Sequence, residues 1–99
     1  MTITKPNYLS GTVGATPVVL DTFSIDAPVS ITISPGSGNT SLIETSTTIT
    51  AVSDPATAIW LEWPAGVVNA DTRDVSFGKI VAIRFTRVTG TSLDTYEVA

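Results

Sequence analysis

The sequence predicts an all-β protein, an antiparallel β-sandwich of about seven to eight short strands, for three reasons. Apolar residues alternate with hydroxyl residues along Val29–Ser34, which is the period of a half-buried strand. Turn-forming residues interrupt the chain at spacings of about 8–12 residues. No segment repeats apolar residues at the spacing of an amphipathic helix with suitable caps. We therefore expect one sandwich domain over residues 16–99, preceded by an extended N-terminal arm over residues 1–15.

The first half of the chain supplies the arm and two strands. Residues 1–15, MTITKPNYLSGTVGA, hold few strongly apolar positions, so we expect an extended arm or a short edge strand that lies outside the core. Residues 29–34, VSITIS, form the first clear strand, and the glycines of residues 35–39, PGSGN, can adopt positive φ in a turn. Residues 40–52, TSLIETSTTITAV, are rich in β-branched side chains, which favours a second strand.

A segment with two tryptophans comes next. Ser53–Pro55 ends the preceding strand, and TAIWLEW at residues 57–63 predicts another. Side chains alternate between the two faces of a strand, so Trp60 and Glu62 should share the outer face. The side chains expected to face the core are Ile59, Leu61 and Trp63.

The last third of the chain predicts three more strands. A short strand begins at Val67–Val68, and residues 69–74, NADTRD, form a polar loop. Residues 75–88 continue as strand, residues 90–92 predict a hairpin turn, and residues 93–99 close the sandwich. Within the long run the side chains should alternate, with one face carrying Val81, Ile83 and Phe85 and the other carrying Ala82, Arg84 and Thr86.

Composition limits the partners of such a domain. Charged residues make up only 14% of the chain, and Ser and Thr stand where Lys and Glu usually would. A surface of hydroxyl groups repels its neighbours weakly, which favours packing against other protein. The net charge of −4 leaves no basic patch that would release counterions from a nucleic acid, so we expect no nucleic-acid partner. No apolar run approaches about 18 residues, so we expect no membrane partner.

The residues that most enzymes need are largely missing. The chain has no histidine and no cysteine, which removes Ser-His-Asp and Cys-His catalysis and the usual zinc ligands. Nine acidic residues are present, but a glycosidase also needs a cleft that a domain of this size can barely form. Residues 69–74 lack the central glycine and distal glutamate of a calcium-binding EF-hand loop. We therefore expect no enzymatic activity, no cofactor and no metal site.

Trp60 has the most open prediction. A position on the outer face of its strand is compatible with packing inside its own subunit, or with anchoring a contact to another chain, where Trp and Arg are frequent. A third alternative is a carbohydrate platform, in which a sugar ring stacks on Trp60 and Glu62 accepts a hydroxyl group. Arg84 would share the outer face of its own strand, whereas Arg87 would lie on the core side and reach past it to solvent or to a partner.

Roughly the last forty residues carry a family resemblance. WPAGVVNAD at residues 63–71 and GKIVAIRFTRVTGTSLDTYEV at residues 78–98 resemble the C-terminal halves of small all-β proteins encoded among tailed-bacteriophage structural genes. Those proteins show a turn with Trp and Gly, a strand with an Ala-x-Arg-Phe/Thr step, and a Gly-rich hairpin before the closing strand. The corresponding residues here are Trp63 and Gly66, then Ala82, Arg84 and Phe85, and finally Gly90.

The resemblance implies a non-enzymatic virion protein, either a capsid decoration (cement) protein or a small head or tail accessory protein. Its partners would be further copies of itself, with a trimer at a threefold site expected, and the major capsid protein or another virion protein. The alternative is a carbohydrate- or receptor-binding module of a phage tail or fibre. The residues expected at an interface are Pro6, Tyr8, Leu9, Trp60, Arg84 and Arg87.

Overall fold

The computed structural model describes residues 8–99, which form eight strands and one short 3-10 helix. The strands are β1 (Leu9–Val13), β2 (Val18–Asp21), β3 (Val29–Ser34), β4 (Thr40–Ser46), β5 (Leu61–Glu62), β6 (Thr72–Ser76), β7 (Ala82–Thr89) and β8 (Asp94–Val98). The helix, η1 (Pro55–Thr57), lies in the long connection between β4 and β5. The predicted all-β class is confirmed.

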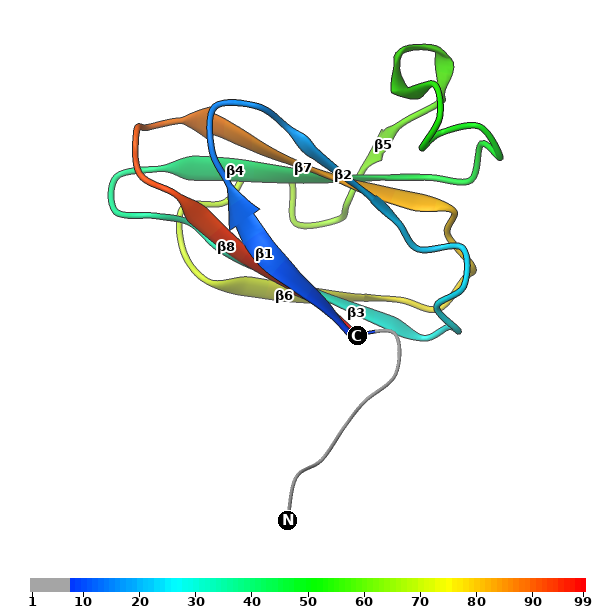
Figure 1. The fold of residues 1–99 in the computed structure, drawn as a ribbon. Helices are drawn as coiled ribbons and strands as arrows, with labels where there is room; N and C mark the ends of the chain where they lie inside the picture. Colours follow the sequence, from blue (N-terminus) through cyan, green and yellow to red (C-terminus); the bar gives the residue numbers. More distant parts are fainter. Residues whose placement is uncertain (1–7) are drawn as a thin grey trace.

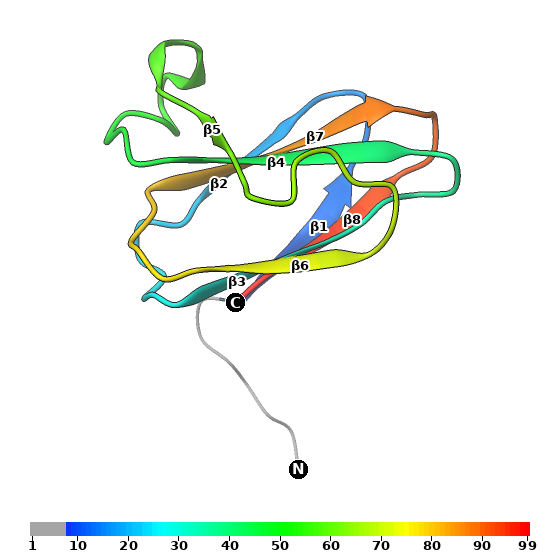
Figure 2. The same ribbon diagram turned by 180° about the vertical axis from the view of Figure 1, so that it is seen from behind.

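The strands form two four-stranded sheets that pack against each other (Figure 1 and Figure 2). Sheet A has the order β1-β8-β3-β6 and sheet B the order β2-β7-β4-β5, and every pairing is antiparallel. Every connection crosses from one sheet to the other except the one between β4 and β5. This is the strand order of a jelly roll, an eight-stranded double-sheet architecture with two Greek keys. The predicted antiparallel sandwich is confirmed.

The core lies between the sheets and is built from alternating side chains. In β3, Val29, Ile31 and Ile33 are buried, whereas the hydroxyl residues between them are half-buried. Phe85 of β7 and Tyr96 of β8 stack across the two sheets with ring centroids 4.4 Å apart. The other members of the buried cluster are Val13, Ile25, Ile43, Trp63, Ile80, Ile83 and Val98. Removing these side chains from water, at about 25 cal/mol per Å² of apolar surface, is the main favourable contribution to folding.

The chain enters the sandwich earlier than the sequence predicts. β1 pairs with β8 from Leu9 opposite Val98 to Val13 opposite Asp94, and it forms one edge of sheet A. The expected edge strand is thus present, but the expectation that residues 1–15 stay outside the core is wrong, because Val13 is fully buried. The segment looks polar because its central inward position is Gly11, where a Cβ would lie 2.5 Å from the hydroxyl oxygen of Tyr96. Residues 1–7 lie outside the described part of the chain.

The tryptophan segment is mostly not a strand. Only Leu61–Glu62 pairs with β4, because the proline at position 55 starts helix η1 and the chain then approaches the sheet edge irregularly. Trp63 is buried as predicted, but the expectation that Ile59 and Leu61 face the core is wrong, since both are exposed. The alternation rule fails here because it holds only where backbone pairing keeps the chain extended.

Three further boundaries differ from the sequence prediction. β6 begins at Thr72, so the second half of the predicted polar loop is strand, with Arg73 Nε donating a 3.0 Å hydrogen bond to Thr32 Oγ1 of β3. The predicted run over residues 75–88 breaks between β6 and β7. The predicted hairpin turn at residues 90–92 instead crosses between the sheets, because β7 belongs to sheet B and β8 to sheet A.

Candidate interaction surface

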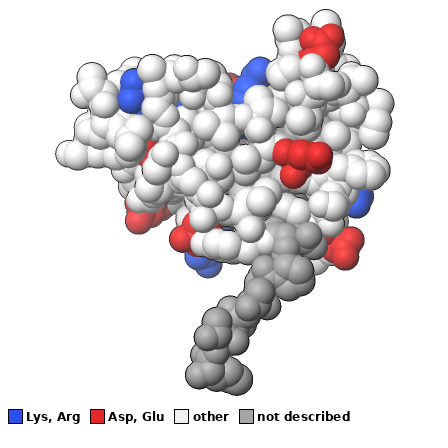
Figure 3. Space-filling model, viewed as in Figure 1, with Lys and Arg blue, Asp and Glu red and all other residues white. Residues whose placement is uncertain are grey.

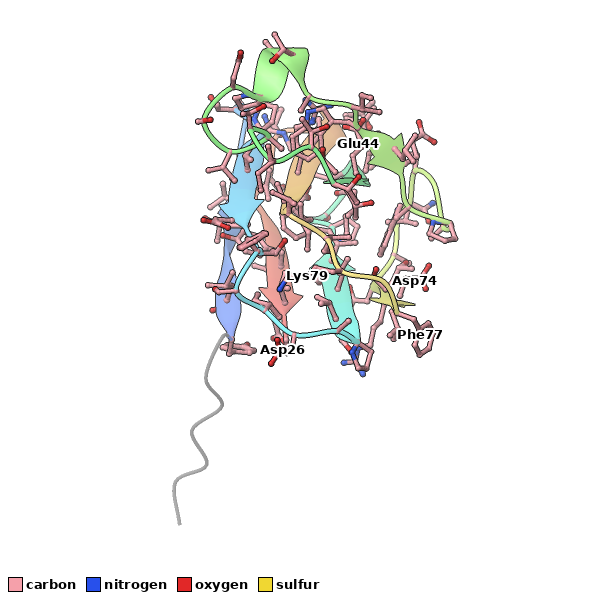
Figure 4. The ribbon with its side chains drawn as sticks, turned by 90° about the vertical axis from the view of Figure 1, so that its right-hand side faces the viewer. Asp26, Glu44, Asp74, Phe77 and Lys79 are labelled. Carbon is pink, nitrogen blue, oxygen red and sulfur yellow. The ribbon has the colours of Figure 1, made fainter. Side chains whose placement is uncertain are left out.

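Three loops gather at one end of the sandwich (Figure 1). They connect β2 to β3, β4 to β5 and β6 to β7, so the strand order itself brings them together. Each loop exposes large apolar side chains: Phe23 has 51% of its surface exposed, Ile49 72%, Val52 40% and Phe77 82%. We call these four residues the apolar loop end. Figure 4 faces this end and shows Phe77 and Lys79 on the β6–β7 loop, with Asp26 on the β2–β3 loop.

A shallow groove of about 340 Å³ joins three members of the apolar loop end, Phe23, Ile49 and Val52, whereas Phe77 lies outside it toward β6 (Figure 4). Its lining residues are Asp21, Phe23, Ile49, Val52, Ser53 and Val81. Lys79 Nζ lies 4.9 Å from the centre of the Phe23 ring, a cation–π contact that joins two of the loops. Loops on a rigid scaffold commonly carry function, and contiguous exposed apolar groups mark interaction sites. This end of the sandwich is therefore the strongest candidate for a contact surface.

Trp60 packs inside its own chain. Its Nε1 donates a 2.9 Å hydrogen bond to the carbonyl oxygen of Pro55, and the guanidinium carbon of Arg84 lies 4.4 Å from the ring centre. Arg84 also pairs with Glu44, directly opposite on β4, with Nη2 and Nε at 2.9 and 3.0 Å from Glu44 Oε1. These contacts are the intrachain packing named among the three alternatives for Trp60, and an additional contact of its half-buried ring with another chain stays a prediction. The guanidinium covers one ring face, which leaves no room for a sugar to stack on that side.

The other residues expected at an interface do not join this stack. Arg87 Nη1 donates a 2.9 Å hydrogen bond to the carbonyl oxygen of Ser92, so its guanidinium ties β7 to the turn before β8. Tyr8 is exposed and Leu9 half-buried, both at the start of β1. Pro6 lies outside the described residues. The described members of the expected set are therefore spread over three places: Trp60 and Arg84 over the outer face of sheet B, Arg87 at the β7–β8 turn, and Tyr8 and Leu9 at the β1 edge of sheet A.

A second groove, of about 270 Å³, opens where β5 and β6 are the outermost strands of the two sheets. Its lining residues are Ile31, Thr45, Leu61, Glu62, Trp63, Pro64, Asp74, Val75 and Ser76. Asp74 stands opposite Ile31 in the β3–β6 register, so its carboxylate lies on the inner face of sheet A. Small-molecule sites usually measure about 300–1,000 Å³. This groove is smaller and suits one or two side chains.

A buried carboxylate clamps the opposite end of the sandwich. Asp94 is fully buried and accepts hydrogen bonds from Gly36 N at 2.8 Å, Asn39 Nδ2 at 2.7 Å and Ser41 Oγ at 2.6 Å. Asn39 Nδ2 also donates to the carbonyl oxygen of Ser92 at 2.8 Å. The network joins β8 to the β3–β4 turn and is structural. Sequence analysis missed it, although an aspartate two residues before the inward-facing Tyr96 was a usable signal.

Among residues 8–99, no group of three or more acidic side chains is placed to hold a metal ion. No helix in the same range has the length and apolar content needed to cross a bilayer. Comparison of the chain with protein-family models, curated proteins and solved structures finds no match. The resemblance of residues 63–98 to phage structural proteins gains no support from these comparisons, so function must be inferred from the surfaces themselves.

Proposed function

We propose that the protein is a non-enzymatic structural subunit of a virion, a capsid decoration protein that self-associates and binds the shell through its apolar loop end. The observation that carries the proposal is the exposure of Phe23, Ile49, Val52 and Phe77 on three converging loops. Apolar surface gains about 25 cal/mol per Å² when a partner covers it, so these side chains favour binding to another protein.

The fold and the surface charge support the same role. The jelly-roll strand order occurs in viral capsid proteins and in lectin domains, although a fold alone does not establish a function. Figure 3 shows charged side chains scattered over a mostly uncharged face. Such a face can approach other subunits with little electrostatic repulsion.

The contact would use few anchor residues. Stable protein interfaces bury about 1,600 Å² in total, and a handful of well-packed side chains supply most of the free energy. Phe23 and Phe77 are the aromatic members of the loop end and are its best anchors, with Lys79 and Asp26 as polar residues at the same end (Figure 4). The carbohydrate-binding alternative has less support, because Arg84 covers one face of Trp60 and Trp63 is buried.

Co-sedimentation tests the proposal directly. Virus particles would be prepared from a lysate of cells in which this gene has been deleted, and the purified protein would be added back. We expect the wild-type chain to sediment with the particles. The double variant Phe23→Ser/Phe77→Ser should bind at least about tenfold more weakly, which corresponds to about 1.4 kcal/mol.

Val67→Ser is the matched control for this experiment. Val67 is 53% exposed, close to the 51% of Phe23, but it lies in the β5–β6 loop at the other end of the sandwich. The control should bind as the wild type does. Equal binding by all three proteins would exclude the loop end as the contact surface, and no binding by the wild type would exclude the decoration role.

A further inference from the structure

β6 is an open edge of sheet A. It pairs with β3 on one side, and no strand in the described part of the chain lies on its other side. An open edge presents backbone N–H and C=O groups that can accept an additional strand. The groove between β5 and β6 runs beside this edge, so an added strand would also place alternate side chains in the groove.

The groove between β5 and β6 is complementary to one apolar side chain and one cation. Ile31 and Trp63 are buried in it, but Leu61 keeps 67% of its surface exposed. Asp74 Oδ1 accepts a 2.8 Å hydrogen bond from the N–H of Val75. Among the described residues the one ion pair is Arg84–Glu44, so the Asp74 carboxylate has no cationic partner there.

The first seven residues, MTITKPN, have the matching pattern. Ile3 and Lys5 are two residues apart and would share one face of an extended strand. Lys5 is the single charged side chain in this segment, whereas residues 8–99 carry four cations against nine acids. Seven extended residues span at most about 23–25 Å, which exceeds the roughly 17 Å of a five-residue strand such as β6. The segment is therefore long enough to cover the edge.

We propose that residues 1–7 of one copy add as an antiparallel strand to the β6 edge of a second copy, with Ile3 opposite Ser76 and Lys5 opposite Asp74. Ile3 then fills the groove beside Leu61, and the ammonium group of Lys5 meets the inward carboxylate. In this register Thr4 stands opposite Val75 and Pro6 opposite Arg73. Thr4 can donate to the carbonyl oxygen of Val75, and it can accept from the N–H of Val75 once Lys5 draws the Asp74 carboxylate away from it, whereas Pro6 has no N–H and can only accept from Arg73. These backbone hydrogen bonds supply affinity, and the side chains of Ile3 and Lys5 fix the register.

Donor and acceptor lie at opposite edges of the same sheet. The segment precedes β1, and β1 and β6 are the two outermost strands of sheet A (Figure 2). Each copy then donates at one edge and accepts at the other, and such a heterologous contact either closes into a ring or forms an open chain. A closed ring of three copies would be the expected trimer. The inference rests on the self-association in the proposed function, but not on the loop end or on a virion partner.

Disulfide trapping tests the predicted register, and because the chain has no native cysteine, only the introduced cysteines can form disulfides. Two single variants, Ile3→Cys and Ser76→Cys, would be mixed in equal amounts and oxidised, with the second uniformly labelled with ¹⁵N. Residues opposite each other in an antiparallel pair have Cβ atoms about 4.5–5.5 Å apart, near the range that a disulfide spans. We expect the mixed-label dimer to be the main cross-linked product in a mass spectrum. Thr12→Cys, exposed on the β1 edge, replaces Ser76→Cys in the control and should give little of it.

Light scattering on the full-length chain separates the outcomes. We expect deletion of residues 1–7, or Lys5→Glu, to convert the oligomer to monomer, and Lys5→Glu/Asp74→Lys to restore part of the assembly. An oligomer that survives the deletion and gives no mixed-label dimer would overturn the inference and leave self-association standing. A wild-type chain that is monomeric at all concentrations would contradict both the strand-addition inference and the self-association in the proposed function. The double variant Ile3→Cys/Ser76→Cys distinguishes the two possible positions of the segment. If its disulfide forms only within single chains, residues 1–7 lie on the β6 edge of their own chain, and the proposal that they bind a second copy is refuted.

Discussion

Replacing Asp94 with alanine should strongly destabilise the sandwich. The carboxylate is fully buried and holds Gly36 N, Asn39 Nδ2 and Ser41 Oγ at 2.6 to 2.8 Å. Alanine removes the acceptor for all three donors and leaves them beside a gap in an otherwise satisfied interior. No buried side-chain nitrogen or oxygen among the described residues lacks a partner in the wild type.

The size of the effect follows from the donors left behind. Each buried donor without a partner costs about 1–3 kcal/mol, so three give an upper range of about 3–9 kcal/mol. Asn39 keeps its bond to Ser92 O and the Ser41 hydroxyl can rotate, so we expect a loss in the lower part of this range, about 3–5 kcal/mol. A domain of ordinary stability has about 5–15 kcal/mol in total. The alanine variant would therefore lose a large share of its folding free energy.

Urea unfolding followed by far-UV circular dichroism measures this loss, with Asp94→Asn as the matched variant. Asparagine keeps an acceptor for Gly36 N and Asn39 Nδ2, and Ser41 Oγ can accept from the new amide, so its cost should be only about 1 kcal/mol. The midpoint should fall far more for alanine than for asparagine, at an unchanged slope. Equal losses for the two variants, or a loss below about 1 kcal/mol for alanine, would refute the role given to this network.

Three further predictions concern other parts of the fold. Gly90 has φ 108°, a backbone conformation that costs a side chain roughly 1–2 kcal/mol, and a new Cβ there would also overlap Asn39 Oδ1, so Gly90→Ala should destabilise the fold by well over this amount. Gly38 has φ 77° but open space around it, so Gly38→Ala should cost only the backbone penalty. Thermal melts compare the two variants. Arg84→Ala should shift tryptophan emission to the red and lower the free energy of unfolding by about 1 kcal/mol. Arg84→Lys should give a smaller red shift, and an unchanged spectrum in Arg84→Ala would mean that the Arg84–Trp60 stack is absent in solution. At a protein concentration low enough for the wild type to be monomeric, deletion of residues 1–7 should change the melting temperature by no more than a few degrees. Deletion of residues 1–15 also removes β1 with the buried Val13 and should lower it sharply; similar melting temperatures for the two deletions would contradict the place of β1 in the core.

Local patterns predicted the parts of the fold that alternate strictly. Val29–Ser34 is a strand with the bounds and the buried face expected, because every second residue is a β-branched apolar one. Val81, Ile83 and Phe85 are also buried on one side as expected, although β7 begins only at Ala82. Ala82 is buried too, although it lies on the opposite side, and alternation alone gives no sign of what covers it.

Features set by distant contacts could not be predicted in this way. The first three residues of β6, Thr72–Asp74, are predicted as polar loop because the inward side chains of this strand border an open groove and not closed core. The network around Asp94 joins residues more than fifty positions apart, and no local window contains it. The apolar loop end likewise depends on the strand order, which brings three separate loops to one end. Phe23 and Phe77 taken singly are unremarkable exposed aromatics.

The composition of the virus particle tests the central claim most directly. Particles purified from a lysate of cells that carry the gene would be analysed by quantitative mass spectrometry for this chain and for the major shell protein. A decoration subunit should be present at a fixed ratio to the shell protein through successive gradient and washing steps. If the chain is absent from the particles, or its ratio falls with each wash, the virion role proposed here is contradicted.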